Sequence, residues 1–397
     1  MKARDRKYSC LMFLKDATDI SLLVPGRWLY GKRVRQTRTI FMTPYKPPDR
    51  SLSWIGIIQE KSGAEHENPL LINVCVQKGS LIASGFVGNQ HMQSSVEIVY
   101  KAASYERTPF NKAEMDLLWN KNVLILGLGT GGSKIALELA RAGVGNLILC
   151  DPDKLEVANI SRHEGDIFDV GKPKVQVAAE RIYRINPAIQ VKSYYEDIFE
   201  RPQEEVEGIF ESADLAVAAT DKTSVQLLTN EITHKLGIPC VFGGCYEEAL
   251  GGEVFFTLPG KTMPCLACLR SGLKQPSKRS NIDYSTASGP NDYQGQPGLH
   301  AAVDFVTCIE IQICLGIMLQ GSRTSKLAQM IDPRRNFLLI GGALSQGFYR
   351  FRKPFDIFYQ PLSGPKKDCV VCQQSIATDT VESSDIEHAT RKDKSHV

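Results

Sequence analysis

The sequence predicts an α/β protein with a doubly wound parallel sheet, and three neighbouring features favour this fold. Val123 to Leu126 and Leu147 to Cys150 are short apolar runs, which are typical of buried parallel strands. A glycine-rich turn follows the first run, and Ser133 to Ala142 then has the pattern of a helix. Strand, turn, helix and strand in this order make one βαβ unit, the building block of a Rossmann-like sheet.

The turn carries Gly127, Gly129 and Gly132 in the spacing G-x-G-x-x-G. Such glycines let the backbone approach a phosphate at a helix N-terminus. Asp151 ends the second strand, 19 residues after Gly132, where an acid can hold ribose hydroxyls. The glycines alone are weak evidence, because tight turns need glycine for steric reasons. Together with the strand, the helix and the acid, they favour nucleotide binding.

Further polar groups follow this unit. Asn159 and Arg162 form an Asn-x-x-Arg pair, and Lys174 comes soon afterwards. A dinucleotide cofactor brings only a pyrophosphate, whereas added amide and cationic donors suit a triphosphate whose charge shifts during reaction. Ala213 to Asp221 indicates a third strand ending in an acid, and Asp221 is well placed to hold Mg²⁺ on the phosphates. The alternative for Asp221 is a helix N-cap.

This ordered set of motifs resembles the nucleotide-binding core of the ubiquitin-activating, or ThiF/MoeB/HesA, adenylyltransferase superfamily, in a prokaryotic-like form. The resemblance covers about Arg107 to Cys372. It implies a sheet of the ubiquitin-activating type and an enzyme that converts ATP to AMP and pyrophosphate, adenylating the C-terminal glycine of a ubiquitin-like protein. Carried over by motif, the implied site residues are Gly127, Gly129 and Gly132 at the phosphates, Asp151 at the ribose, Asn159, Arg162 and Lys174 at phosphate oxygens, and Asp221 at Mg²⁺.

Two residues, Gln226 and Arg107, match the superfamily pattern less closely than the others. Gln226 stands where many relatives have arginine, although Asn230 keeps its place, so one polar contact is in doubt. In the superfamily an arginine upstream of the glycine turn reaches the ATP phosphates across a dimer interface. This implies that Arg107 acts in trans within a homodimer. The alternative is a solvated arginine at the start of an amphipathic helix, which the pattern from Tyr105 to Trp119 predicts.

Two Cys-x-x-Cys knuckles lie far apart in the chain, the first with Cys265 and Cys268, the second with Cys369 and Cys372. Four thiolates in two knuckles have the number and spacing of a tetrahedral structural Zn²⁺ site. Such a site would tie the C-terminal segment to the core, and the superfamily often has one. The alternatives are buried thiols or a redox pair.

A thioester would need a nucleophilic cysteine, which relatives often place in or near a crossover loop. Residues 269–299 are expected to be this loop, and they contain no cysteine. Cys245, which follows a double glycine beside the predicted pocket, is the remaining candidate; the alternative is a half-buried turn cysteine. Four other cysteines in apolar segments are expected to be core thiols: Cys150, Cys240, Cys308 and Cys314.

The composition is that of a soluble globular protein, with 397 residues, 43% hydrophobic and 23% charged. The net charge of +3 is too small to indicate nucleic acid or a membrane surface as the main partner. No apolar run approaches the ~20 residues of a membrane span. Asp16 and Asp19 interrupt the apolar patch at the N-terminus before any signal-peptide cleavage site. We therefore expect a cytoplasmic protein.

The chain is expected to have three parts. Residues 1–104 should form a small β-rich domain of unknown role, residues 105–374 the ATP-binding adenylation domain with its crossover loop, and residues 375–397 a disordered tail. Three runs with the pattern of short strands support the first part: Trp54 to Ile58, Leu71 to Val76 and Val96 to Tyr100.

The favoured function is therefore adenylation of a ubiquitin-like protein, and a thioester and transfer to a conjugating enzyme could follow. One alternative is a non-catalytic member of the fold that presents a ubiquitin-like partner, but a pure scaffold has no need of phosphate-binding residues. Another is an NAD-dependent oxidoreductase. That reading leaves Asn159, Arg162, Lys174 and the cysteine knuckles without roles.

Overall fold

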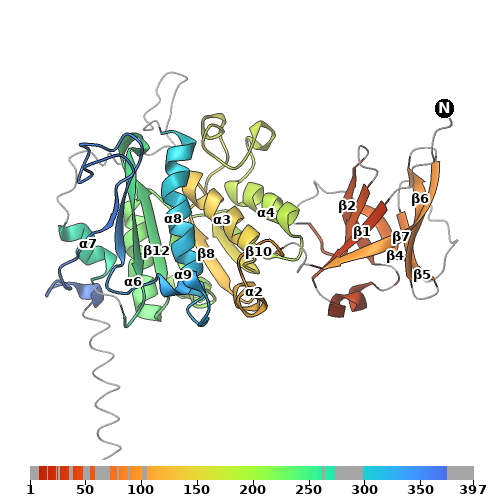
Figure 1. Cartoon of the computed structure of the whole chain (residues 1–397), viewed down its shortest axis with the longest axis horizontal. Coiled ribbons are helices and arrows are strands. Elements are labelled where there is room, and N and C mark those ends of the chain that lie inside the picture. The colour runs from red at the N-terminus through yellow and green to blue at the C-terminus, as the bar shows by residue number, and fades with distance from the viewer. Residues whose placement is uncertain are drawn as a thin grey trace, which may run out of the picture. The chain divides into compact units, whose positions relative to one another are not determined.

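The computed structural model describes residues 9–372 except 16, 24, 26, 35–38, 48–53, 59–71, 78–79, 88–89, 101–104, 262–263 and 273–297. Most of the expected crossover loop and the expected tail therefore lie outside the described residues. The chain divides into two compact units (Figure 1). The first is Met1–Pro109 with Ala140–Gly143 and Ala179–Val191, and the second is Phe110–Leu139, Val144–Ala178 and Lys192–Val397.

Most of the first unit is a closed β-barrel with the strand order β1-β3-β2-β4-β5-β6-β7. Its strands are β1 (Ser9–Leu14), β2 (Trp28–Val34), β3 (Thr39–Thr43), β4 (Trp54–Ile58), β5 (Ile72–Gln77), β6 (Ser80–Val87) and β7 (Gln90–Tyr100), and η1 (Ala17–Leu22) is a 3-10 helix. Buried side chains such as Met12, Leu14, Leu29 and Ile40 fill the interior. Parallel pairing of β1 with both β3 and β7 closes the barrel.

The second unit contains, within its described part, an eight-stranded sheet in the order β10-β9-β8-β11-β12-β13-β14-β15. The strands are β8 (Asn122–Leu126), β9 (Asn146–Cys150), β10 (Gln190–Tyr194), β11 (Leu215–Ala218), β12 (Cys240–Cys245), β13 (Gly251–Thr257), β14 (Phe337–Gly341) and β15 (Ile357–Tyr359). Along the described chain the α-helices are α2 (Lys112–Trp119), α3 (Thr130–Ala142), α4 (Lys174–Ile185), α5 (Gln203–Glu211), α6 (Thr223–Leu236), α7 (Leu266–Gly272), α8 (His300–Met318) and α9 (Lys326–Gln329). The division between the units falls within α3 and α4. The fold is thus mixed α/β with two sheets, the larger one Rossmann-like.

Strands β9, β8, β11 and β12 are parallel, so their carboxyl ends share one edge of the sheet. From β8 the chain goes first to β9 on one side and later to β11 on the other side. Such a reversal of strand order leaves a crevice at the carboxyl ends, where ligands of open α/β sheets bind. Strands β13, β14 and β15 extend the sheet in antiparallel fashion.

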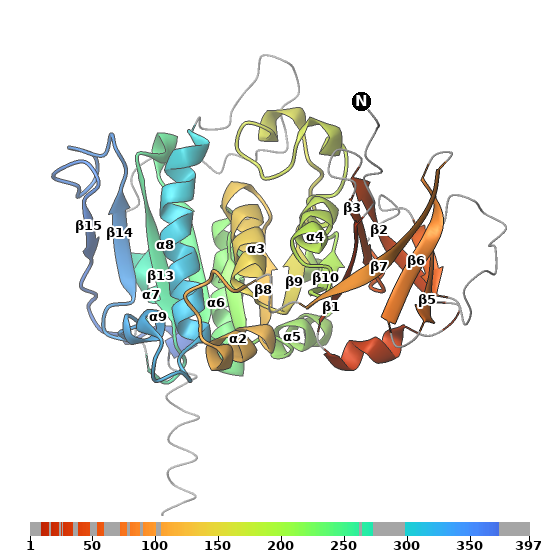
Figure 2. The same cartoon turned by 45° about the vertical axis from the view of Figure 1, so that its right-hand side comes forward.

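Helices cover both faces of this sheet. Side chains of α5, α6 and α7 pack with Phe242, Phe255 and other buried residues on one face. On the other face α3 and α8 lie side by side (Figures 1 and 2). Among the described residues, α8 alone is long and apolar enough to cross a membrane by length and composition. Most of its second half is buried, including Val306, Glu310 and residues 313–318, which is the setting of a core helix.

Two helix starts differ from the sequence expectation. The helix expected from Tyr105 begins only at Lys112, because Pro109 precedes it and Asn111 forms a capping box with Glu114. Arg107 consequently lies in an exposed turn and not on a helix. In contrast, α3 begins at Thr130, inside the glycine motif.

Candidate functional site

The glycine turn connects β8 to α3 at the carboxyl edge of the parallel strands. Gly127 has a φ of +88°, and a Cβ there would lie 2.7 Å from the carbonyl oxygen of Ala219. A Cβ at Gly132 would lie 1.9 Å from the carbonyl oxygen of Gly127, so the backbone requires glycine at both positions. At Gly129 a Cβ would meet no described atom within 4 Å. The open space beside Gly129, at the start of α3, is where a phosphate can approach.

Asp151 follows β9 directly and is held by two backbone groups. The N–H of Leu128 donates to its Oδ2 at 2.6 Å, and the N–H of Asp153 donates to its Oδ1 at 2.8 Å. Burial raises the pKa of this carboxyl, while the nearby ammonium of Lys174 and the two N–H donors oppose the rise. Asp151 is therefore fixed beside the glycine turn, with lone pairs left for a ribose hydroxyl.

Asn159 and Arg162 lie on the segment between β9 and α4. Asn159 ends the 3-10 helix η2 (Val157–Asn159), and its Oδ1 accepts from the N–H of Glu156 at 3.0 Å. Its NH₂ group can therefore turn toward a ligand. Arg162 is half-buried, and a Cβ built at Gly298 would lie 3.6 Å from its Nη1. The guanidinium thus lies beside the residues that lead into α8.

Lys174 begins α4 and brings a positive charge to the same edge. Its Nζ donates to Oδ2 of Asp153 at 2.8 Å. Asp221, just after β11, is exposed, yet desolvation by the surrounding protein raises its pKa, and Lys222 and Lys174 oppose the rise. One ammonium among the carboxylates of Asp151, Asp153 and Asp221 suits a site that takes Mg²⁺ together with phosphates.

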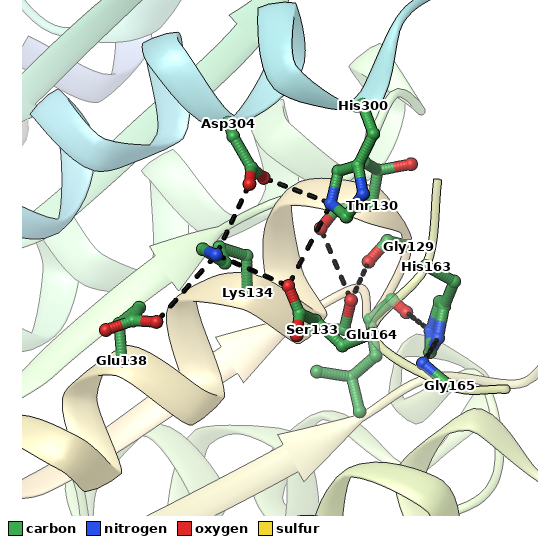
Figure 3. Close-up of polar contacts among 11 residues, drawn as sticks. Gly129, Thr130, Ser133, Lys134, Glu138, His163, Glu164, Gly165, His300 and Asp304 are labelled. Atoms are coloured by element: carbon green, nitrogen blue, oxygen red, sulfur yellow. Dashed lines mark hydrogen bonds and ion pairs between the residues drawn. The ribbon is translucent and has the colours of Figure 1, made fainter. Parts of the chain in front are cut away.

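Figure 3 shows a second charged group, which the sequence patterns did not indicate. Nζ of Lys134 on α3 lies 3.3 Å from Oδ2 of Asp304 and 3.5 Å from Oε1 of Glu164. Nε2 of His300 lies 3.2 Å from Oδ1 of Asp304. Burial lowers the pKa of Lys134, but the carboxylates of Glu164, Asp304 and Glu138 outweigh this and raise it. Since the ammonium of Lys134 pairs with both Glu164 and Asp304, we read the group as a tie between α3, α8 and the segment before α4.

Gln226 is buried on α6 at the position where the resemblance led us to expect arginine. Its Nε2 donates to the carbonyl oxygen of Thr220 at 2.8 Å, and Nη2 of Arg270 donates to its Oε1 at 3.2 Å. Arg270 also forms an ion pair with Glu253 on β13. A guanidinium from α7 thus lies against Gln226. Sequence patterns missed Arg270 because only the fold brings α7 next to α6.

Cys245 is the last residue of β12. Its side chain is exposed, but crowding by protein atoms desolvates the thiol and raises its pKa to about 12, with Glu310 adding to the rise and Arg162 opposing it. The structure therefore places Cys245 within electrostatic reach of Arg162. A thiol with such a pKa is protonated at neutral pH, so Cys245 is not a preformed thiolate nucleophile.

Glu310 is a buried carboxyl on α8, with 4% of its surface exposed. Burial raises its pKa to about 8. Its Oε1 has no hydrogen-bond partner among the described residues. The carboxyl lies against the backbone of β12, because a Cβ at Gly243 would come within 2.2 Å of its Oε2. Glycine at this position therefore makes room for the carboxyl.

The expected core thiols are found with one exception. Three are buried, namely Cys150, Cys240 and Cys314, whereas Cys308 is exposed. The expectation for Cys308 was wrong because α8 keeps one face open at its midpoint, where Gln312, one turn later, is also exposed.

The two cysteine knuckles meet in space. Sγ of Cys265 lies 3.6 Å from Sγ of Cys369 and 4.0 Å from that of Cys268, which in turn lies 3.7 Å from that of Cys372. All four sulfur atoms lie within 4.8 Å of one another. A tetrahedral zinc ion with Zn–S bonds of about 2.3 Å would place sulfurs about 3.8 Å apart, so these residues fit the ion. The contact with Cys372 lowers the pKa of the Cys265 thiol.

Several known proteins are similar to this chain. The sulfur carrier protein adenylyltransferase of Thermus thermophilus is 34% identical over 151 residues, which are 37% of this chain and 55% of that protein. The ubiquitin-like modifier-activating enzyme 5 of Dictyostelium discoideum is 32% identical over 159 residues, 38% of this chain and 42% of the relative. The ThiS adenylyltransferase of Bacillus subtilis is 32% identical over 171 residues, 42% and 48% of the two chains. The matched region thus spans about half the length of these relatives.

A solved structure of Escherichia coli MccB with ATP is also similar, with 22% identity and a TM-score of 0.49 over 66% of this chain and 69% of that chain. The ThiF family matches residues 103–340, more than half of the sequence. The match includes the glycine turn, every phosphate-site residue named above and the first cysteine knuckle. The chain therefore belongs to the ThiF family, as its motifs predicted.

Proposed function

We propose that this protein uses ATP and Mg²⁺ to adenylate the C-terminal glycine carboxylate of a ubiquitin-like protein. One observation carries the proposal above the others. The open backbone at Gly129 follows β8, and Asp221 follows β11, at the carboxyl edge where the strand order reverses, and the charge of Lys174 acts on Asp221. The names of the relatives support an adenylyltransferase, since they act on sulfur carrier proteins or ubiquitin-like modifiers.

In the proposed reaction the acceptor carboxylate attacks the α-phosphorus of ATP, a carboxyl–phosphate bond forms, and the bond to pyrophosphate breaks. The attacking oxygen carries no proton, so side chains are needed to position and neutralise anions and not to remove protons. Arg162 and Lys174 would hold phosphate oxygens, and Asp151 would hold the ribose. Mg²⁺ near Asp221 would neutralise charge on the leaving pyrophosphate.

We further propose that Cys265, Cys268, Cys369 and Cys372 hold a structural Zn²⁺. The support is the fit of the four sulfur atoms to a tetrahedron. A closed set of four thiolates leaves no position for substrate, so the ion would serve the fold and not the reaction.

Exchange of labelled pyrophosphate into ATP tests the reaction. We would supply small ubiquitin-like proteins that end in Gly-Gly one at a time, each next to a version without its last glycine. Exchange that depends on the intact tail supports the proposal. A protein whose melting temperature rises with NAD and not with ATP would instead be the oxidoreductase. ATP binding without exchange for any acceptor would favour the non-catalytic, partner-presenting alternative.

A thioester on Cys245 is a second step that the nearby Arg162 favours and the raised thiol pKa opposes. If the step occurs, Cys245→Ala should retain pyrophosphate exchange but form no thiol-labile adduct with its acceptor. Cys308→Ala is the matched control, because Cys308 is also exposed. An adduct on reducing and non-reducing gels that persists in Cys245→Ala rules this residue out. No adduct in the wild type indicates an enzyme that stops at the adenylate.

The proposal extends to a homodimer in which Arg107 reaches the phosphates of the partner, and to a conjugating enzyme that receives the product in the cytoplasm. Exposed apolar side chains support a dimer contact on the segment of Arg162: Val157, Ile167 and Phe168 are 65%, 54% and 90% exposed. Light scattering should therefore give twice the chain mass. Phe168→Glu should give the single chain mass.

A further inference from the structure

His163 lies directly after Arg162 and is buried, with 5% of its surface exposed. Its Nε2 lies 2.8 Å from the carbonyl oxygen of Leu128, in the glycine turn. Its Nδ1 lies 2.8 Å from the backbone nitrogen of Gly165. The ring therefore bridges the glycine turn and its own segment, and His163 lies 35 residues after Leu128 in the chain.

The partners determine which nitrogen carries the proton. The N–H of Gly165 can only donate, so Nδ1 must accept and has no proton. The carbonyl oxygen of Leu128 can only accept, so Nε2 must be the donor. His163 is thus a neutral imidazole. Its Nε2–H donates to the glycine turn, and its Nδ1 accepts from Gly165 in its own segment.

The bond to Leu128 reaches the centre of the candidate site. Leu128 stands between Gly127 and Gly129, and its N–H donates to Asp151 at 2.6 Å. Leu128 is consequently held at its N–H by Asp151, the proposed ribose ligand, and at its carbonyl oxygen by His163. The residue next to His163 is Arg162, which is assigned to the phosphates.

We propose that His163 is a positioning residue that fixes the segment of Arg162 against the glycine turn, so that both meet the triphosphate in one arrangement. This inference rests on the proposed function, because it assumes that the turn and Arg162 bind the same nucleotide. It does not make His163 a ligand of ATP. It predicts that the donor at Nε2, and not the acceptor at Nδ1, supports triphosphate binding.

Two substitutions separate the two hydrogen bonds. In His163→Gln the longer amide can still donate to Leu128, but the acceptor for Gly165 is lost. In His163→Asn the shorter amide can still accept from Gly165, but the donor to Leu128 is lost. Binding of the magnesium complex of α,β-methylene-ATP is measured calorimetrically for both variants and the wild type, on the full chain. We expect His163→Gln to stay within about threefold of the wild type and His163→Asn to bind about tenfold more weakly, the factor of one lost buried hydrogen bond.

The outcomes are distinct. Weaker binding in His163→Gln than in His163→Asn, equal loss in both, or wild-type binding in both would each overturn the positioning role. Should the Asn variant fail to fold, His163→Met replaces it, because Met and Gln both lack the Nδ1 acceptor and differ in the donor to Leu128. A wild type that does not bind the analogue contradicts the proposed function itself, and so differs from every outcome above.

Discussion

Two groups of polar side chains in the second unit are stabilised in different ways. One is the proposed nucleotide site at the carboxyl edge of the parallel strands, the nucleotide edge, with Asp151, Lys174 and Asp221. The other is the cluster of four cysteines. At the nucleotide edge the charged groups already have partners in the protein: Asp151 accepts two backbone N–H groups, and Lys174 contacts Asp153. In the cluster of Cys265, Cys268, Cys369 and Cys372, four sulfur atoms meet one another within 4.8 Å. A site that releases its ligand must be stable without it, whereas a structural metal site links the fold to the ion.

This difference makes a general expectation for substitutions in the two regions. Changes at the nucleotide edge should reduce activity while the protein stays folded. Changes in the cysteine cluster should reduce stability first and activity only as a consequence.

The largest effect should come from the cysteine cluster. If the cluster holds the proposed Zn²⁺, Cys265→Ser and Cys369→Ser should each lose it and lower the unfolding free energy by more than about 3 kcal/mol, because structural zinc contributes of order 10 kcal/mol in small zinc domains. Metal analysis and urea unfolding measure both quantities. Cys308→Ser is the control, since this exposed thiol lies outside the cluster. If the metal-free protein were as stable as the wild type, the cysteine cluster would not differ from the nucleotide edge in its effect on stability.

The next largest effect should come from Arg162 and Lys174, the two cationic side chains that are proposed to hold phosphate oxygens. Arg162→Ala and Lys174→Ala should each slow pyrophosphate exchange by about two to three orders of magnitude, the range for a lost charge that stabilises a transition state. Their melting temperatures should stay near that of the wild type. Lys172→Ala is a matched control, because it removes a nearby ammonium that pairs with Asp169 at 3.1 Å. Wild-type exchange in Lys174→Ala would show that this edge is not the reacting site.

The glycine turn allows a contrast within one motif. Gly132→Ala should destabilise the fold by about 3 kcal/mol, since its Cβ would overlap the carbonyl oxygen of Gly127. Gly129→Ala should leave the melting temperature nearly unchanged, because its Cβ points into open space. It should nevertheless weaken binding of the ATP analogue about tenfold or more, because the methyl group occupies the place of a phosphate. Unchanged binding in a folded Gly129→Ala protein would place the phosphates elsewhere.

The last prediction concerns pH and Glu310, where the expected change is small for each pH unit. The folded protein keeps this carboxyl protonated up to a pKa of about 8, while the unfolded chain releases the proton near 4.5. Between these values the folded state binds more protons, so stability falls as pH rises, by about 1.4 kcal/mol per unit for this group. Urea unfolding at pH 5 and pH 8 should show this loss in the wild type and not in Glu310→Gln. Equal pH dependence of the two proteins would mean that the carboxyl is solvated.

Local sequence patterns were sufficient to predict the central parallel strands, the glycine turn and the two Cys-x-x-Cys pairs. Val123 to Leu126 and Leu147 to Cys150 are strands as predicted, since buried strands need only a short apolar run. Strand β10, Gln190–Tyr194, was not predicted, because it is at the sheet edge and has no buried residue. The contacts of Arg270 with Gln226 and of Lys134 with Asp304 could not be predicted from the sequence, since each joins residues that only the tertiary fold brings together.

The close approach of Glu310 to Gly243 has a consequence for how this chain can evolve. A side chain at position 243 and a full-length carboxyl at position 310 compete for the same volume, since a Cβ would come within 2.2 Å of the carboxyl oxygen. The two positions should therefore change together. Among descendants of this sequence, an alanine or serine at 243 should occur with a shorter residue at 310, and a lineage that acquires only the first change should be lost through instability.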